Sequence, residues 1–251
     1  MRTLTLLSLF ALFFSAFAYG GTLPCEGGPG SANTFNLPCL FYAGDFDPNN
    51  PNANGLANEN DAVVGGNPYG SATYQNFYWQ DHGSGKVIVG LLTNNLSQLT
   101  PTAGYWEIRS GVSEGNGGTL VASGTATGQN LLQTATGRSG FGYTEYTDAV
   151  QIPAMDPANG QYWFAVVPVC TSCNGRSFNS NTFGLNKVGK SDDNLQYWNS
   201  PYFGRNFTNA NNNGIFPALS SGVLATPEPS SILMLGSGLL AAAGVVRRRL
   251  F

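Results

Sequence analysis

Between residues 20 and 225 the chain has no long stretch in which apolar residues recur at helical spacing. Short runs rich in aromatic and β-branched residues occur instead, and Gly, Asn, Pro and Ser separate them. This pattern is typical of an all-β chain, because strands are short and tight turns favour residues that tolerate unusual backbone angles. A parallel α/β fold would need crossover helices, for which the sequence shows no pattern. We therefore expect an all-β fold.

Six segments carry the clearest strand pattern: 77–79, 86–93, 105–110, 120–125, 149–152 and 162–167. In the third, Trp106 and Ile108 alternate with Glu107 and Arg109, as in a strand that buries one of its faces. Turn residues recur between these segments at regular intervals. The spacing predicts a single antiparallel β-sandwich with jelly-roll topology over residues 19–208.

The last part of this region is less regular. Residues 177–213 are rich in Asn, Ser and aromatic side chains, and a disordered segment would contain fewer aromatics. Strands or packed loops are therefore expected to continue to about Phe207. The following segment, 209–225, is expected to be a linker.

Charged residues make up 10% of the chain, compared with roughly 25% in an average soluble protein. Without Glu228 and the four arginines near the two ends, the 11 basic and 14 acidic residues fall to 7 and 13. The remaining body therefore has a formal net charge of −6. Such a body has no basic patch to neutralise phosphates, so nucleic-acid binding is not expected.

Residues 1–18 have the features of a secretory signal peptide. Arg2 precedes a short apolar run, and Ala16-Phe17-Ala18 presents the small residues that signal peptidase accepts. The run is shorter than the roughly 20 residues that a membrane-spanning helix needs. We expect export by the Sec route and cleavage after Ala18 by signal peptidase, with an uncleaved membrane anchor as the alternative.

The segment 226–251 has three parts: Pro227-Glu228-Pro229, the apolar residues 232–246, and the basic residues Arg247, Arg248 and Arg249. The two prolines favour an extended backbone around Glu228. The apolar part is just long enough for a transmembrane helix in a thin bilayer. Arginines directly after such a helix stop its transfer and hold that end in the cytoplasm.

This three-part tail resembles the PEP-CTERM sorting signal. The resemblance implies that an exosortase, a membrane-embedded cysteine transpeptidase or protease, recognises the tail and cleaves near Glu228. It also implies a Gram-negative bacterium that makes extracellular polysaccharide, in which the chain is first anchored in the inner membrane and then reaches the cell surface or matrix. The Leu-Pro-x-Thr-Gly signal of Gram-positive sortases is absent. An ordinary anchor that is never cut is the alternative.

The body resembles those of exported PEP-CTERM proteins of unknown function. In residues 105–123 an aromatic strand ends in Ile-Arg-Ser-Gly and precedes a Gly-rich hairpin and a Leu-Val-Ala-Ser-Gly strand. Residues 160–164 read Gly-Gln-Tyr-Trp-Phe, which is similar to a strand of the same bodies. The resemblance implies a carbohydrate-binding-like sandwich and no established activity.

The body contains four cysteines: Cys25, Cys39, Cys170 and Cys173. An even number in an exported chain predicts two disulfides. Local pairing (Cys25 with Cys39) and crossed pairing both remain open. The spacing Cys170-Thr-Ser-Cys173 also occurs in zinc half-sites and redox pairs, but zinc would need a second close pair, and a redox motif should open a helix.

Asp45, Asp47 and Asn49 place oxygen-bearing side chains at alternate positions, as Ca²⁺ loops do. Glu59 and Asp61 follow closely and could complete such a site. The same letters also occur in an Asn/Asp/Pro-rich turn without metal. No cofactor other than this Ca²⁺ is expected.

Aromatic side chains in Gly- and Asn-rich segments suggest a sugar-binding face, because sugar rings stack on Tyr and Trp. The candidates are Tyr69, Tyr74, Tyr78, Trp79, Tyr143, Tyr146, Trp198 and Tyr202. Packing in the core explains such residues equally well. His82 is the single histidine, and no Gly-x-Ser-x-Gly elbow accompanies it.

These features together predict a non-enzymatic protein of the cell surface or extracellular matrix that associates with extracellular polysaccharide. One alternative is a secreted carbohydrate-active hydrolase on a jelly-roll scaffold, which would need two carboxylates in an aromatic groove. The other is a purely structural matrix subunit.

Overall fold

The strand-rich body forms fourteen β-strands in the computed structural model, which describes residues 25, 35, 37–60, 70–170, 173 and 175–226. The signal peptide over residues 1–18 and the tail from Pro227 onward lie outside the described residues. All six segments predicted as strands lie in or overlap a strand. Two short 3₁₀ helices, η1 (Gly128–Asn130) and η2 (Ala210–Asn213), connect strands. The chain is therefore all-β over the described residues.

The first sheet has six strands, all antiparallel to their neighbours. In spatial order they are β12 (Arg205–Asn209), β11 (Tyr197–Ser200), β3 (Ala72–Trp79), β9 (Gly160–Val169), β5 (Ala103–Ser110) and β6 (Thr119–Thr127). The prediction that Trp106 and Ile108 share the buried face of β5 is confirmed, since both belong to the main core. Glu107 on the opposite face is also buried, because Phe207 and other apolar side chains pack on that side of the sheet.

The second sheet has eight strands arranged around β4 (Ile88–Ser97). The others are β1 (Cys39–Tyr42), β2 (Gly55–Ala57), β7 (Leu131–Gly140), β8 (Tyr143–Met155), β10 (Ser177–Thr182), β13 (Ala218–Leu219) and β14 (Ser221–Ala225). One edge of β4 pairs with β8 along its length, and the other edge pairs with β14 and then with β10. The central strand therefore joins segments from the middle and the end of the body, and β1 from its beginning pairs with β14.

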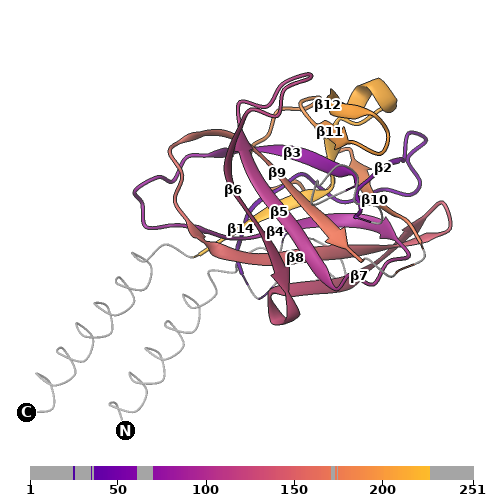
Figure 1. Ribbon diagram of the computed structural model, residues 1–251, viewed down its shortest axis with the longest axis horizontal. Coiled ribbons are helices and arrows are strands. Elements are labelled where there is room, and N and C mark those ends of the chain that lie inside the picture. The colour runs from indigo at the N-terminus through magenta and orange to yellow at the C-terminus, as the bar shows by residue number, and fades with distance from the viewer. Residues whose placement is uncertain are drawn as a thin grey trace, which may run out of the picture.

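One apolar core lies between the two sheets. Residues of β4 and β8, such as Leu91 and Val150, pack with residues of β3, β5 and β9, such as Phe77, Trp106 and Phe164. Figure 1 shows the strands of one sheet crossing those of the other, with β5, β6 and β9 over β4 and β8. The predicted β-sandwich requires such an arrangement of two antiparallel sheets. The finer prediction of a jelly-roll topology stays a prediction.

The segment 209–225 is not a linker, and that prediction is wrong. Its last part forms β14, which pairs with β1 on one side and with β4 on the other. All five residues of β14 are buried, among them Val223 and Leu224. The sequence did not indicate this strand, because the segment contains many small and polar residues. Such residues are needed here, since Ser221 and Gly222 lie in the middle of a sheet where larger side chains would not fit. A Cβ on Gly222 would come within 2.9 Å of the Phe41 carbonyl oxygen.

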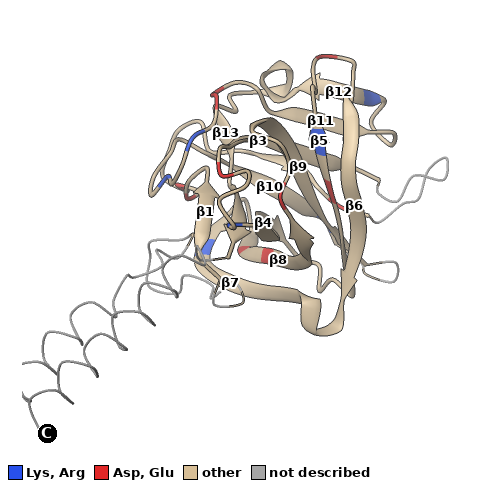
Figure 2. Cartoon of the chain, turned by 90° about the vertical axis from the view of Figure 1, so that its left-hand side faces the viewer, with Lys and Arg blue, Asp and Glu red and all other residues tan. Residues whose placement is uncertain are grey.

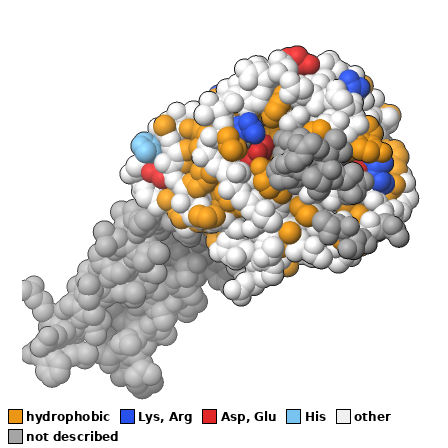
Figure 3. All heavy atoms as spheres, in the orientation of Figure 1, with side chains coloured by type: hydrophobic (Ala, Val, Ile, Leu, Met, Phe, Trp, Pro, Cys, Tyr) orange, Lys and Arg blue, Asp and Glu red, His pale blue; other side chains and the backbone are white. Residues whose placement is uncertain are grey.

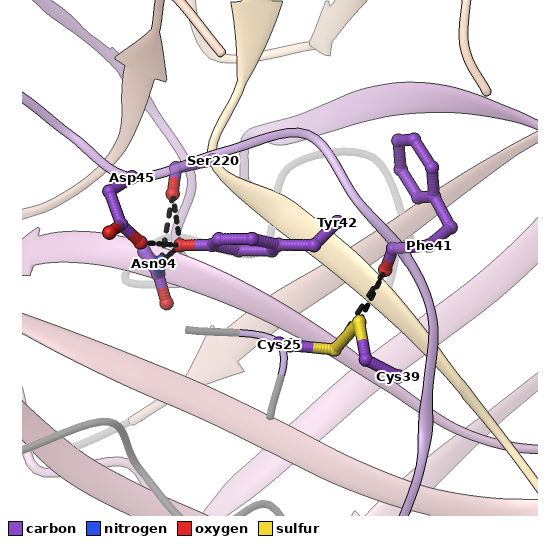
Figure 4. The surroundings of a disulfide bond; sticks show 7 residues. All are labelled: Cys25, Cys39, Phe41, Tyr42, Asp45, Asn94 and Ser220. Carbon is purple, nitrogen blue, oxygen red and sulfur yellow. Dashed lines mark hydrogen bonds between the residues drawn. A yellow bond between two sulfur atoms is a disulfide. The ribbon is translucent and has the colours of Figure 1, made fainter. Parts of the chain in front are cut away.

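Both disulfides have the local pairing, Cys25 with Cys39 and Cys170 with Cys173. Cys25 packs with Leu92, Ala149 and Leu224 on the outer face of the eight-stranded sheet. In Figure 4, Tyr42 lies beside this disulfide and points toward Asp45, Asn94 and Ser220, while the Phe41 side chain points away from that group. The bridge therefore attaches the segment before β1 to the sheet.

A polar group interrupts the core at one end. The Asp148 carboxylate accepts hydrogen bonds from Asn95 Nδ2 (2.8 Å) and Gln133 Nε2 (2.9 Å), and it is fully buried. Asn95 in turn accepts a hydrogen bond from Asn58. Burial raises the pKa of Asp148 to about 7, and the two amide donors offset only part of this desolvation. Near neutral pH the Asp148 carboxyl therefore changes between its protonated and its charged form.

The pKa of Asp148 predicts a pH-dependent stability. The unfolded chain releases this proton near pH 4, whereas the folded chain keeps it until about pH 7, so the contribution of Asp148 is complete below pH 4 and falls as the pH rises. The side-chain amide in the variant Asp148→Asn cannot titrate. We expect the free energy of unfolding of the variant, relative to the native chain, to rise by about 1.4 kcal/mol per pH unit between pH 4 and pH 7. Denaturant unfolding at several pH values measures this slope, and a constant difference would contradict the prediction.

Candidate ligand-binding face

Three segments that are distant in sequence bring aromatic side chains together on the surface. They are the β7–β8 hairpin, the start of β10 and the turn between β11 and β12. We call this surface the aromatic face, and it consists of Phe141, Tyr143, Arg176, Phe178, Tyr202 and Phe203. Phe141, Tyr202 and Phe203 are 65%, 59% and 41% exposed. Large apolar side chains so exposed are available for contact with a ligand.

Four rings of the face form two contacting pairs with Arg176 between them. Tyr143 and Phe178 meet edge to face with centroids 5.4 Å apart, and Tyr202 and Phe203 do the same at 4.8 Å. The Arg176 guanidinium lies between the two pairs, 5.2 Å from the centroid of Phe178 and 5.8 Å from that of Phe203. These separations are in the range of favourable aromatic and cation–π contacts. The face is therefore one connected surface.

Glu59 fixes the position of Arg176. It is 2% exposed, and its Oε1 accepts a hydrogen bond of 2.7 Å from Arg176 Nε. Its second oxygen accepts a hydrogen bond of 2.8 Å from the backbone N–H of Ser177. A carboxylate bound in this way holds the guanidinium plane in one orientation, so the central cation of the face is preorganised.

A small cavity of about 190 Å³ opens beside Phe178. Its lining consists of Asn54, Gly55, Leu96, Phe141, Tyr143 and Phe178. A Cβ at Gly55 would lie 2.9 Å from the Phe178 Cβ, so a larger residue would displace the ring. The cavity combines aromatic walls with one side-chain amide, so it offers apolar contact and one hydrogen-bonding group.

The Phe141 side chain stands at the tip of a two-residue hairpin between Gly140 and Tyr143. Phe141 and Gly142 have φ values of 56° and 82°, which such a turn requires. Asn or Gly would adopt these angles with less strain than a bulky aromatic residue. Phe141 therefore combines a strained backbone conformation with an exposed ring.

Two of the sequence candidates, Tyr143 and Tyr202, lie on the aromatic face. Trp198 is buried at its base, 5.4 Å from the Phe203 ring. Tyr74 and Trp79 are buried, Tyr78 and Tyr146 are half-buried, and Tyr69 lies outside the described residues. Sequence reasoning missed Phe141 and Arg176 in particular, although the Phe-Gly-Tyr tip of the hairpin was a usable signal.

At the predicted Ca²⁺ site, Asp45, Asp47 and Asn49 make hydrogen bonds within the protein. Both oxygens of Asp45 are bound by protein donors, Oδ1 by Tyr42 Oη at 2.7 Å and Oδ2 by Asn186 Nδ2 at 2.7 Å. Asp47 Oδ1 accepts a hydrogen bond from the backbone N–H of Asn49, which describes a turn. Within the described residues no three acidic, histidine or cysteine side chains gather as metal ligands do. Asp61 lies outside the described residues, and the Ca²⁺ site stays a prediction.

The carboxylates near the aromatic face are buried and paired. Glu145 accepts a hydrogen bond of 2.6 Å from Ser180 and forms an ion pair of 2.5 Å with Arg138, which also lies 3.4 Å from Asp45.

His82 is remote from this group and pairs on an exposed turn with Asp156, at 3.2 Å. A hydrogen bond from the Gly83 N–H, with a smaller effect of His82, holds the pKa of Asp156 below its usual value.

The architecture and the tail define a class of protein: an exported, membrane-transiting surface protein with a two-sheet body. Residues 225–249 match the PEP-CTERM protein-sorting motif, so the chain carries this signal and exosortase is its processing partner. The motif places the protein on the surface of a Gram-negative bacterium. No curated protein and no solved structure matches the chain. Among the described residues there is no helix long and apolar enough to span a membrane, and the predicted helix over 232–246 lies outside them.

The Glu59–Arg176 pair allows a test of the preorganised face. In a double-mutant cycle with Glu59→Gln and Arg176→Met, we expect a coupling of about 1.5 kcal/mol or more in the free energy of unfolding, because Glu59 is buried. The matched control is the exposed pair Lys187 and Asp193, 3.5 Å apart, with Lys187→Met and Asp193→Asn. Its coupling should stay below about 0.5 kcal/mol. Equal couplings for both pairs would show that Glu59 does not hold Arg176 in place.

Proposed function

We propose that this chain is a non-enzymatic surface or matrix protein whose aromatic face binds extracellular polysaccharide. The Sec pathway exports it, signal peptidase removes residues 1–18, and the apolar segment 232–246 anchors it in the inner membrane until exosortase cleaves near Glu228. The observation that carries the proposal is the aromatic face. Its rings at Phe141, Tyr202 and Phe203 are exposed, and half-buried Tyr143 and Phe178 lie between them beside Arg176.

The chemistry of the face suits a sugar chain. The C–H groups of a sugar ring form an apolar surface that packs on an aromatic ring, while its hydroxyl groups need hydrogen-bond partners. The face supplies exposed rings at Phe141, Tyr202 and Phe203, a guanidinium at Arg176 and an amide at Asn54. Several rings in a row can contact successive sugar units, which fits a polymer better than a single small molecule.

The state of the carboxylates supports a binding role over hydrolysis. A glycosidase needs two carboxyl groups that reach the substrate from opposite sides. Near the face, Glu59 and Glu145 are buried, and each is bound to an arginine. Neither can reach a bound sugar without leaving its partner, so the hydrolase is the weaker alternative.

Substitution of exposed rings tests the binding role. The protein purified from the cell surface should bind polysaccharide from its own matrix, and Phe141→Ala should weaken this binding about fivefold or more, since one stacked ring contributes about 1 kcal/mol or more. Phe141 is exposed and strained, so its removal should not reduce the thermal stability of the body. Ile215→Ala removes an exposed apolar side chain outside the face and should bind as the native chain does. Unchanged affinity for Phe141→Ala and for Phe203→Ala would refute the proposal.

Mass analysis tests the processing. The native chain recovered from the cell surface should lack the residues after the Pro227-Glu228-Pro229 region, whereas Glu228→Ala should accumulate in the membrane fraction with Phe251 retained. Glu114→Ala removes an exposed glutamate of the body and should be processed normally. Recovery of the native chain from the surface with its C-terminus intact would rule out cleavage.

A further inference from the structure

Arg205 differs from the other arginines that the structure describes. Each of the others pairs with an almost fully buried carboxylate: Arg109 with Glu107, Arg138 with Glu145, and Arg176 with Glu59. Arg205 is exposed, and it forms no ion pair with a described carboxylate. Its guanidinium keeps its charge at every physiological pH and is therefore available to an anionic group from outside the chain.

A tight turn between β11 and β12 places Arg205 beside exposed rings of the aromatic face. The Pro201 carbonyl accepts a hydrogen bond of 3.2 Å from the Gly204 N–H. Tyr202 and Phe203 are therefore the two central residues of this turn. Gly204 has a φ of 62°, which favours glycine, and Arg205 follows as the first residue of β12. The turn thus holds two rings and one guanidinium close together.

The Trp198 ring connects Arg205 to the rest of the aromatic face. The Arg205 guanidinium lies 5.8 Å from the centroid of this ring, and the Phe203 ring contacts it at 5.4 Å. Trp198 is buried, and its Nε1 donates a hydrogen bond of 2.6 Å to Ser71 Oγ. Figure 2 shows the basic residue of β12 at the rim of the molecule. The row of contacts on the aromatic face therefore extends beyond Phe203 to Arg205.

The described residues that form the aromatic face carry no negative charge. None of them is acidic, and the neighbouring Glu59 and Glu145 are 2% and 0% exposed. Charged side chains are few and scattered on the side of the body that Figure 3 shows, and most of that surface is neutral. On such a surface, an unpaired guanidinium beside exposed rings favours a ligand of negative charge.

We propose that the aromatic face selects an anionic polysaccharide, and that Arg205 binds the carboxylate groups of its acidic sugar units. This inference rests on the proposed function, since it names the class of polymer that the same face binds. The two oxygens of a carboxylate match the planar fork of N–H groups in a guanidinium. The ring of an acidic sugar still has an apolar C–H surface, which can pack on Tyr202 or Phe203 while its carboxylate reaches Arg205.

The first test compares two forms of one polymer. Polysaccharide from the native matrix is used as it is, and after chemical reduction of its carboxylates to neutral –CH₂OH groups. The native chain should bind the reduced form about fivefold more weakly or worse, as expected for the loss of a partly exposed ion pair. Sulfate and phosphate groups survive this reduction, so equal affinity for both forms would show that carboxylates are not the bound groups.

The second test removes the charge of Arg205. The variant Arg205→Gln should bind the untreated polymer about fivefold more weakly than the native chain does. It should bind the reduced polymer with the native affinity, which also shows that the variant is folded and that its rings are in place. Lys187→Gln removes a cation from an exposed site beyond the opposite end of β10 and should keep the native preference.

Three outcomes would overturn the inference. They are equal binding of both polymers by the native chain, a full preference for the untreated polymer in Arg205→Gln, and an equal loss of both polymers in that variant. In the first two, sugar binding by the rings is intact, and only selection by charge is refuted. A native chain that binds neither polymer would refute the proposed function as well, so the two failures are distinguishable.

Discussion

Hydrogen bonds of the Asn94 side chain hold together the centre of the eight-stranded sheet. Its Nδ2 donates to Tyr42 Oη (2.7 Å) and to Ser220 Oγ (2.8 Å), and its Oδ1 accepts from Thr147 Oγ1 (2.8 Å). These partners come from β1, β8 and the segment between β13 and β14, and all of them are buried. A buried amide that lost one partner would keep its desolvation cost. These hydrogen bonds therefore join β1, β8 and the segment that leads into β14 at the centre of the sheet.

Neutral polar side chains perform the same task elsewhere in the molecule. Between the sheets, Asn95 donates a hydrogen bond to Asp148 and accepts one from Asn58. Asn179 donates hydrogen bonds to backbone oxygens near β14. The carboxylates of Glu59 and Glu145 near the aromatic face are both bound to arginines of the same chain. The exposed rings of the aromatic face remain available for contact with other molecules.

The sequence predicted the β class and the positions of the strongest strands because alternating and continuous apolar runs are local signals. It could not reveal β14, whose Ser221 and Gly222 fit the sheet only because Phe41 and Leu92 approach so closely. The face of β5 with Glu107 was expected to be polar and open, yet Tyr74 and Tyr105 donate hydrogen bonds to this carboxylate, and Arg109 pairs with it beneath Phe207. The aromatic face depends on segments more than 30 residues apart, from Tyr143 to Phe178, so its assembly is a tertiary property. Only the hairpin tip at Phe141 could have been recognised locally.

The end of the body has a mechanical consequence for the sorting tail. Thr226 N–H donates to the Val87 carbonyl (2.9 Å), and Thr226 Oγ1 accepts from the Val87 N–H (3.2 Å). Pro227 is the next residue, so the Pro227-Glu228-Pro229 region follows directly after the last residue that is hydrogen-bonded to the sheet. If exosortase cleaves near Glu228, as proposed, the cut falls within a few residues of the folded surface, and the new C-terminus moves with the body.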